Sequence, residues 1–422
     1  MEFLQLKEEE FVAFADTHPL RNMWQTREMA ETRRIRGFDI YYVGVKENDQ
    51  IIAGSMISTI PLFMGYKYAQ ALRGYLIDFN NFELFDFFHN NVVKFLKEKK
   101  CLKLRIDPYL EYCQRDLDGN PVEGGFNNQS VVDHLTKLGY KHNGFTRGID
   151  LGVEPRWMYT IPYKGLSADE LFKTFERNCQ RSIKNTERFN VTVRELQRED
   201  LHLFMDVMKH TEERREFEGR DESYYTMMYD VYSKNDNIKF LYCEENLVDY
   251  LEILNKELQA QEKIEKDALA RLETQNSKKM RNKLNEAQNQ INQLHKKIAN
   301  IEALRQEKGD VIVLSSGVFF TYGRETICLM SGVYDEYMQF ASPFAMHWKM
   351  MKEGIAKGQD RYNLYGISGI FEKDANDYGV YLFKKEWNGE VNELLGEFDY
   401  VFHPAINALY NTLRKVKHMI KG

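Results

Sequence analysis

Hydrophobic residues in the middle of the chain recur at alternating steps of four and three, a spacing typical of the a and d positions of a coiled coil. In the second half of this segment these positions are Met280, Leu284, Ala287, Ile291, Leu294, Ile298, Ile301 and Leu304. In the first half they are Leu247, Leu251, Leu254 and Leu258, and the repeat slips before Ile264, Ala268 and Leu272. Residues 274–277 contain no hydrophobic side chain and are the predicted tip of an antiparallel helical hairpin.

Each helix of this hairpin would be roughly 40 Å long, at about 1.5 Å per residue. A rod of that length is consistent with a functional arm. It is equally consistent with a solvated decoration or with a contact between two copies of the chain.

The remaining sequence alternates between strand-like and helix-like patterns, which predicts an α/β (α+β) fold. In the first part, strands are predicted at 39–46, 50–61, 64–72 and 101–108, with a long amphipathic helix at 82–99. The order then recurs from a strand at 157–163, followed by a helix that opens with the capping box Ser167–Glu170 and runs to about Arg188. Later strands are predicted at 238–243, 311–322, 362–365 and 380–387, and a basic helix at 403–421.

A chain of 422 residues is expected to form two or three domains. The predicted division is a first domain at 1–150, a second at 151–245 and 309–398, the hairpin at 246–308, and a C-terminal basic helix at 399–422. Because the chain has only 8 prolines and no Ser/Gly/Pro-rich tract, we expect the domains to contact one another directly.

The composition favours a reduced, cytoplasmic protein. The net charge is −6, so any anionic partner must be bound by local basic patches. The five cysteines are scattered and none forms a CxxC pair or a zinc pattern. The first ten residues are acidic, unlike a signal peptide, and no apolar run approaches the length of a membrane span.

One basic pattern stands out before residue 190. Its members are spaced by four, four, three and four residues, and they are Lys173, Arg177, Arg181, Lys184 and Arg188. On a single helix this spacing places all five on one face, where they could follow the phosphates of a nucleic acid. The alternative is an ordinary solvated helix face.

The sequence contains no recognisable nucleophile site, phosphate-binding glycine loop or metal-ligand cluster, so we predict neither a metal nor a cofactor. A predicted strand of aromatic residues near the C-terminus carries Lys384 and Lys385. A partly desolvated lysine there could stabilise an oxyanion in acyl transfer. Alternatively, the lysine points to solvent from an edge strand.

Several of these segments, taken in order, resemble the FemA/FemB/FemX family of peptidyltransferases, and the resemblance covers nearly the whole chain. Besides the basic helix and the hairpin, the matching segments are Leu104–Tyr109, Leu138–Phe145, Phe217–Tyr225, Asp360–Gly369 and Phe383–Lys385. The resemblance implies two tandem acetyltransferase-like (GNAT-like) domains and a coiled-coil arm. It also implies transfer of an amino acid from aminoacyl-tRNA to an amine of a peptidoglycan precursor, either lipid II or UDP-MurNAc-pentapeptide, or to a growing bridge.

That reaction agrees with the absence of a nucleophile motif, because an aminoacyl ester is already activated and needs positioning and oxyanion stabilisation. The segment Arg34–Asp39 is the nearest match to the pyrophosphate loop of coenzyme A-dependent acetyltransferases. It lacks the final small residue of that loop, which fits a donor other than coenzyme A.

The resemblance also assigns roles to individual residues. Arg33, Arg220 and Tyr224 match acceptor-binding positions, Lys384 matches the lysine associated with the transition state and the donor, and Asp107 lies in a matching motif as a second catalytic candidate. The chain departs from the family pattern at Cys328–Gly332, where relatives have a tyrosine pair before a glycine. Tyr334 is a candidate replacement, so the identity of the acceptor stays open.

Two other functions are consistent with the sequence: a related acyltransferase with another donor or amine acceptor, and a non-catalytic scaffold that binds tRNA or a partner through the hairpin. A lipid-linked acceptor would require contact with the cytoplasmic membrane face, where the basic residues of the terminal helix could contribute; they are Arg414, Lys415, Lys417 and Lys421. The transferred amino acid and a homo-oligomer formed through the hairpin are also left open.

Overall fold

The computed structural model describes residues 1–150, 152–215, 219–274 and 277–421. Two segments discussed above lie partly outside this range. They are the motif 217–225, of which residues 217 and 218 are not described, and the predicted hairpin tip, of which residues 275 and 276 are not described.

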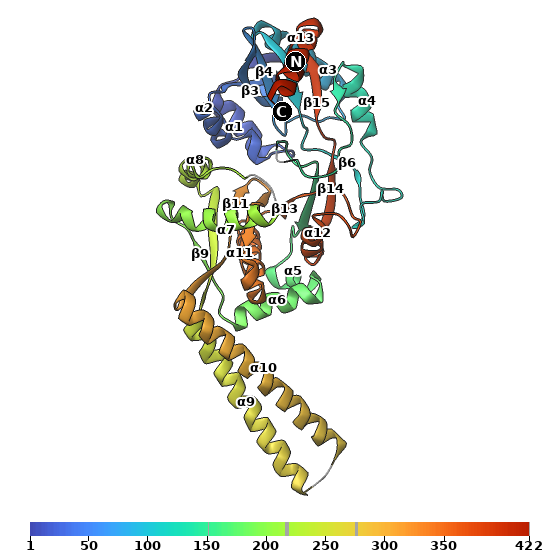
Figure 1. Cartoon of the computed structure of the whole chain (residues 1–422). Helices are drawn as coiled ribbons and strands as arrows, with labels where there is room; N and C mark the ends of the chain where they lie inside the picture. Colours follow the sequence, from blue (N-terminus) through green and yellow to red (C-terminus); the bar gives the residue numbers. More distant parts are fainter. Residues whose placement is uncertain (151, 216–218, 275–276, 422) are drawn as a thin grey trace.

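Two β-sheets form the body of the protein, as the α/β prediction requires (Figure 1). The first sheet contains, in order across it, β1 (Glu2–Gln5), β2 (Asp39–Glu47), β3 (Gln50–Phe63), β4 (Tyr66–Ala71), β5 (Cys101–Ile106), β15 (Phe398–Val401) and β7 (Lys141–His142). The second contains β6 (Glu111–Gln114), β14 (Glu390–Leu394), β8 (Trp157–Pro162), β13 (Arg361–Ile367), β12 (Glu325–Val333), β11 (Val311–Tyr322), β10 (Ile238–Asn246) and β9 (Thr192–Glu195).

Amphipathic helices cover the sheets. In α3 (Phe82–Glu98) the buried residues include Leu84, Phe88 and Val92, which recur every four positions and pack into the core of the first sheet. Asn81 caps this helix by accepting a hydrogen bond from the backbone N–H of Leu84. The other helices of the body are α1 (Glu8–Thr17), α2 (Arg27–Ile35), α4 (Gln129–Lys137), α5 (Ala168–Thr174), α6 (Arg177–Arg188), α7 (Leu201–Arg215), α8 (Glu222–Tyr232), α11 (Ser342–Ala356), α12 (Tyr378–Lys385) and α13 (Pro404–Lys421).

The two sheets exchange strands. β6 comes from the first 150 residues but pairs with β14 in the second sheet, whereas β15 follows the second sheet's last strand and pairs with β5 in the first. The chain therefore crosses the junction between the two sheets, called the seam below, more than once. This favours a fixed orientation of the two sheets relative to each other. The domain boundaries given above stay a prediction.

The predicted helical hairpin corresponds to α9 (Leu247–Thr274) and α10 (Lys278–Lys308), which lie side by side and project from the body (Figure 1). The eight repeat positions predicted in α10 are all buried or half-buried, whereas most residues between them are exposed. In α9 the polar Gln261 occupies a half-buried position between Leu258 and Ile264, where the hydrophobic repeat slips.

The root of the arm is fastened to the body by backbone pairing and aromatic packing. Asn246 of β10 pairs with Val311 of β11, and the backbone N–H of Leu247 donates to the carbonyl of Asp310 at 2.8 Å. Above this pair, the ring of Tyr250 packs edge-on against Phe189, with 5.0 Å between the ring centroids. The arm is thus continuous with the second sheet and its core.

The predicted strand at 380–387 is wrong, because residues 378–385 form the helix α12. Its β-branched and aromatic residues favour strands, but tertiary packing overrides that preference. Tyr381 and Lys384, three residues apart, are the buried positions of the helix, and Tyr381 packs edge-on against Phe371 at 5.1 Å. Three-residue spacing brings side chains onto one face only in a helix.

We expect the root of the arm to depend on Leu254, which is fully buried. Leu254→Ala should lower the free energy of unfolding by about 2–5 kcal/mol, because it leaves a cavity in the packed core at the root of the arm. Leu269→Ala on the same helix is the matched control, since Leu269 is 46% exposed and its truncation should change stability by about 0.5 kcal/mol or less. Urea denaturation followed by circular dichroism measures both. Equal losses in the two variants would contradict the packing described.

Candidate functional site

The seam between the halves is organised around Arg73, which follows β4 and is 1% exposed. Its guanidinium lies over the rings of Trp24 and Tyr109, at 5.4 and 5.7 Å from the ring centroids. Its Nη2 donates to the carbonyl of Pro155 at 2.8 Å, just before β8 of the second sheet. Arg73 therefore joins the edge of the first sheet to the segment that enters the second.

Asp107, directly after β5, contacts both the backbone and the side chain of Arg73. Its Oδ1 accepts the backbone N–H of Arg73 at 2.7 Å, and its Oδ2 lies 3.7 Å from the Arg73 Nε. Burial raises the pKa of Asp107 to about 7, although the Arg73 charge and hydrogen bond act in the opposite direction. The structure thus places this candidate against Arg73 rather than on an open surface.

On the second sheet, a β-bulge in β13 aims Tyr365 at the seam. The pairing of β13 with β8 is irregular between Asn363 and Gly366, and Tyr365 has a φ of 64°. Such a conformation costs of the order of 1–3 kcal/mol for a bulky residue and is concentrated at functional sites. The Tyr365 ring stacks on Trp24 at 6.2 Å, and its hydroxyl donates to the carboxylate of Glu154.

Arg33 of α2 provides a buried cation on the first-sheet side. It is 7% exposed, and its Nη1 donates to the Ser58 hydroxyl at 2.8 Å and to the side-chain amide oxygen of Gln70 at 3.0 Å. Within the described part of the chain, no carboxylate lies within salt-bridge distance of it. Burial, helped by the neighbouring Arg36, lowers its pKa to about 10. A buried cation without a counter-ion is suited to binding an anion.

Tyr224 and Arg220 lie close to each other at the start of α8. The exposed guanidinium of Arg220 is 5.7 Å from the centroid of the Tyr224 ring. Burial and the charge of Glu154 raise the pKa of Tyr224, whereas Arg220 and Arg33 are among the charges that lower it. The three acceptor candidates predicted from the sequence therefore share one electrostatic neighbourhood.

Lys384 is buried on α12, at 8% exposure, and its Nζ donates to the carbonyl of Gly366 at 2.6 Å. Burial lowers its pKa to about 8, against the opposing effects of Cys328 and Asp377. Lys385 points to the other side and pairs with Asp118 at 3.1 Å. Of the two lysines, Lys384 is thus the desolvated one. The two side chains point in different directions because they lie on a helix, not because they alternate along a strand.

The bulge in β13 contacts both Lys384 and Glu154. Gly366, the hydrogen-bond partner of Lys384, directly follows Tyr365, whose hydroxyl reaches Glu154. Tyr365 and Gly366 of β13 thus link Lys384 to Glu154, whose charge acts to raise the pKa of Arg33 and of Tyr224.

The five basic residues do not lie on a single helix, so that prediction is wrong. The chain is extended at Phe175 and Glu176, which places Lys173 on α5 and the other four on α6. The break is stabilised by long-range contacts: Phe175 is buried in the core, and the backbone N–H of Glu176 donates to the carbonyl of Glu386 at 3.0 Å. All five residues are nevertheless exposed.

The α6 part of this basic surface connects the Lys384 region with the arm. At one end, Asn178 donates to the carboxylate of Glu386, directly after α12, at 2.7 Å. At the other end, Arg188 forms an ion pair with Glu257 of α9. Arg181 and Lys184 lie between these ends, so the surface runs from the helix of Lys384 to the root of the arm.

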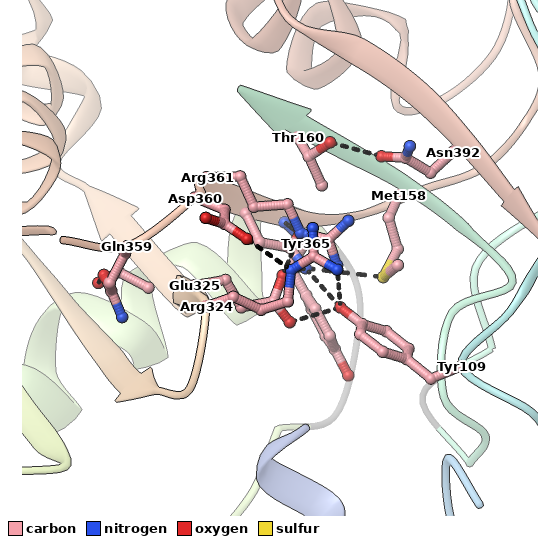
Figure 2. Close-up of polar contacts among 12 residues, drawn as sticks. Tyr109, Met158, Thr160, Arg324, Glu325, Gln359, Asp360, Arg361, Tyr365 and Asn392 are labelled. Carbon is pink, nitrogen blue, oxygen red and sulfur yellow. Dashed lines mark hydrogen bonds and ion pairs between the residues drawn. The ribbon is translucent and has the colours of Figure 1, made fainter. Parts of the chain in front are cut away.

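A second polar cluster, shown in Figure 2, lies beneath the seam and was not predicted. The buried carboxylate of Glu325 accepts hydrogen bonds from the Tyr109 hydroxyl at 2.6 Å and from the Arg361 Nε at 2.7 Å. A cavity of about 280 Å³ adjoins it, with Arg324 and Asn392 among its lining residues. Tyr109 belongs to this cluster through its hydroxyl and to the Arg73 site through its ring.

The segment that departs from the family pattern lies at the Lys384 site. Cys328 is buried, and the charge of Lys384 partly offsets the effect of burial, which raises the Cys328 thiol pKa to about 11. Tyr334, the candidate replacement, packs instead against the ring of His210 at 5.1 Å. All five cysteines are free and buried.

Arg73 and Glu154 were also missed, and no local signal in the sequence marks either of them. Tyr365 lies within the matching segment Asp360–Gly369, so its importance was indicated without its role. Among the described residues, no three acidic, histidine or cysteine side chains are grouped so that they could hold a metal. Within the same residues, no helix has the length and apolar character needed to cross a membrane.

Sequence and structure comparisons agree with this arrangement of two sheets, a seam and an arm. A family model described as the FemAB family matches residues 6–415. The chain is 33% identical to the aminoacyltransferase FemA of Staphylococcus aureus strain MRSA252, and equally to that of strain N315, over all 422 residues and the full length of each relative. A crystal structure of FemX is 26% identical and superposes with a TM-score of 0.77, covering 97% of this chain and 99% of that one.

These matches define a two-sheet α/β protein of the FemX type. The chain belongs to the FemAB family, and the resemblance predicted from its motifs is confirmed.

The Lys384 amine should lose its proton at an unusually low pH. Because burial disfavours the charged form, we expect Lys384 to titrate near pH 8, whereas ordinary lysines titrate near about 10.4. NMR titration of the lysine ε-methylene signals would detect one such residue, and the signal should disappear in Lys384→Met. The Lys385→Met control should retain it. A spectrum in which every lysine titrates above pH 10 would contradict the burial of this amine.

Proposed function

We propose that this protein is an aminoacyltransferase that moves an amino acid from aminoacyl-tRNA to the amine of a peptidoglycan precursor, building the interpeptide bridge of the cell wall. The observation that carries the proposal is the desolvated amine of Lys384, whose partner Gly366 directly follows Tyr365, the residue that hydrogen-bonds to Glu154. This arrangement supports a reaction between two bound substrates, and the FemAB membership supports the donor and acceptor classes.

The reaction needs no covalent enzyme intermediate. The neutral acceptor amine attacks the aminoacyl ester, a C–N bond forms, the ester C–O bond breaks, and the amine proton passes to the 3′ oxygen of the tRNA. Negative charge develops on the carbonyl oxygen of the tetrahedral intermediate. Lys384, protonated below about pH 8, would stabilise this charge in a site with little water.

The acceptor is assigned to the place where α2, on the first sheet, meets α8, which packs on β10 of the second sheet. Arg33, with no counter-ion among the described residues, and the exposed Arg220 would bind the phosphates of lipid II or of UDP-MurNAc-pentapeptide, and Tyr224 would contact the same ligand. Asp107 would act indirectly, by holding Arg73 and so the seam.

The donor is assigned to the basic surface along α6. The basic residues of α6 begin beside the helix of Lys384 and end at the arm, and a tRNA acceptor stem lying along them would bring its 3′ end to Lys384. Lys173 on α5 would extend the same surface.

With a lipid-linked acceptor, the terminal helix α13 would contact the cytoplasmic membrane face. Leu409, Leu413 and Val416 are exposed at steps of four and three, and the exposed Arg414 follows Leu413. Apolar and basic residues on one short helix are suited to the interface of an anionic bilayer.

Purified protein supplied with labelled aminoacyl-tRNAs should transfer label to lipid II, to UDP-MurNAc-pentapeptide, or to a precursor that already carries bridge residues. Lys384→Met should reduce kcat by about 100- to 1000-fold, as expected for loss of an oxyanion-stabilising group, whereas Lys385→Met should leave it nearly unchanged. Absence of transfer to all three acceptors would contradict the proposed reaction. Full activity of Lys384→Met would instead remove Lys384 from the mechanism.

Charge reversal on α6 tests the donor side. The double variant Arg181→Glu/Lys184→Glu should weaken tRNA binding and flatten the slope of log K against log salt by roughly 1.4–1.8, because two phosphate contacts are lost. The control Lys94→Glu/Lys97→Glu alters two exposed lysines with the same spacing on α3 and should preserve the slope. Equal effects of the two double variants would refute the assignment of this surface.

A further inference from the structure

Glu154 lies in the segment that joins the two sheets, between β7 and β8. Residues of both sheets make hydrogen bonds to this segment. The hydroxyl of Tyr365 in the second sheet donates to its carboxylate. The carbonyl of the next residue, Pro155, accepts from the Nη2 of Arg73 at 2.8 Å. Because Arg73 is buried and Tyr365 is half-buried, these two contacts hold the carboxylate in place at the seam.

The groups around Glu154 come from every element that faces the seam. The negative charge of Glu154 acts to raise the pKa of five groups: Arg33 of α2, Arg73 after β4, Asp107 after β5, Tyr224 of α8 and Tyr365 of β13. Arg36 and Arg220 act on members of the same group. The Glu154 carboxylate therefore shares the electrostatic environment of Arg33 and Tyr224, two of the three acceptor candidates.

The two carboxylates at the seam differ in what they can bind. Asp107 is 5% exposed, and its two oxygens face the backbone N–H and the Nε of Arg73. Glu154 is half-buried, and among the residues that the structure describes its carboxylate accepts one hydrogen bond, from the Tyr365 hydroxyl to Oε2. Its other oxygen is therefore the one suited to an incoming donor.

We propose that Glu154 is the binding site for the primary ammonium group of the acceptor. The inference rests on the proposed function and adds to it the group that selects an amine. Phosphates of the acceptor would bind to Arg33 and Arg220, and its ammonium group needs an anion near the donor ester. Glu154 is suited to that role, since it accepts from the hydroxyl of Tyr365, and the next residue, Gly366, is the partner of Lys384.

The role is binding and positioning rather than net proton uptake. The bound ammonium loses one proton to solvent before it attacks, and the second proton leaves with the 3′ oxygen as the C–N bond replaces the C–O bond. Glu154 therefore begins and ends the reaction as a carboxylate.

The test compares two acceptors in binding experiments without tRNA: UDP-MurNAc-pentapeptide with a free side-chain amine, and the same compound with that amine acetylated. Isothermal titration calorimetry should show that the wild-type protein binds the free amine about 10- to 100-fold more tightly, as expected for a charge-assisted hydrogen bond. Glu154→Gln should bind both compounds with nearly equal affinity. The control Tyr365→Phe keeps the carboxylate and should retain most of the preference.

Each outcome separates the inference from the function on which it rests. An unchanged preference for the free amine in Glu154→Gln would overturn the assignment of Glu154, while leaving the transferase function intact. Failure of the wild-type protein to bind either compound, or lipid II, would contradict the acceptor class itself. If Glu154→Gln fails to fold, Glu154→Asp provides the second test: a shortened carboxylate should bind the free amine less tightly but still prefer it, and an undiminished affinity would overturn the proposal.

Discussion

Burial of Arg73 is the constraint on which the site depends. A guanidinium removed from water must be compensated, and Arg73 is compensated by Asp107, by the faces of Trp24 and Tyr109, and by the carbonyl of Pro155. These partners come from both halves of the molecule. Removing a partner from a buried charge typically costs about 3–5 kcal/mol, so the arginine fixes the position of the connecting segment. Through that segment it also fixes Glu154.

In the proposed reaction, the acceptor binds where α2 meets α8, and the donor binds along α6, beside the helix of Lys384. Exchange of β6 and β15 between the sheets ties the halves together, and the bulge in β13 carries Tyr365 toward one side and the Gly366 carbonyl toward Lys384. For a reaction between an amine and an already activated ester, holding the two groups in register provides much of the rate enhancement. A rigid seam with a desolvated lysine suits that requirement better than a flexible hinge.

Local patterns predicted the parts of the fold that local interactions determine. The hydrophobic repeat of the arm, the amphipathic helix α3 and strands such as β2, β3, β5 and β8 follow from periodicity and could be predicted from the sequence. The short strands β1, β6, β14 and β15 were not predicted. The helix α12 and the break at Phe175–Glu176 could not, because they depend on packing around Tyr381 and on a hydrogen bond to Glu386, about two hundred residues away. Lys384 and Arg33 were found through family motifs, whereas Arg73 and Glu154 acquire their roles only when distant segments meet.

The central claim is that donor and acceptor react at the seam between Lys384 and Glu154. A stable conjugate in which an aminoacyl-adenosine is linked to the acceptor amine would mimic both substrates at once. In a crystal structure of that complex, the account predicts the linkage next to the bulge in β13, with its carbonyl oxygen toward Lys384 and the acceptor phosphates at Arg33 and Arg220. Binding of the linkage elsewhere, for example in the cavity beside Arg324 and Asn392, would contradict it.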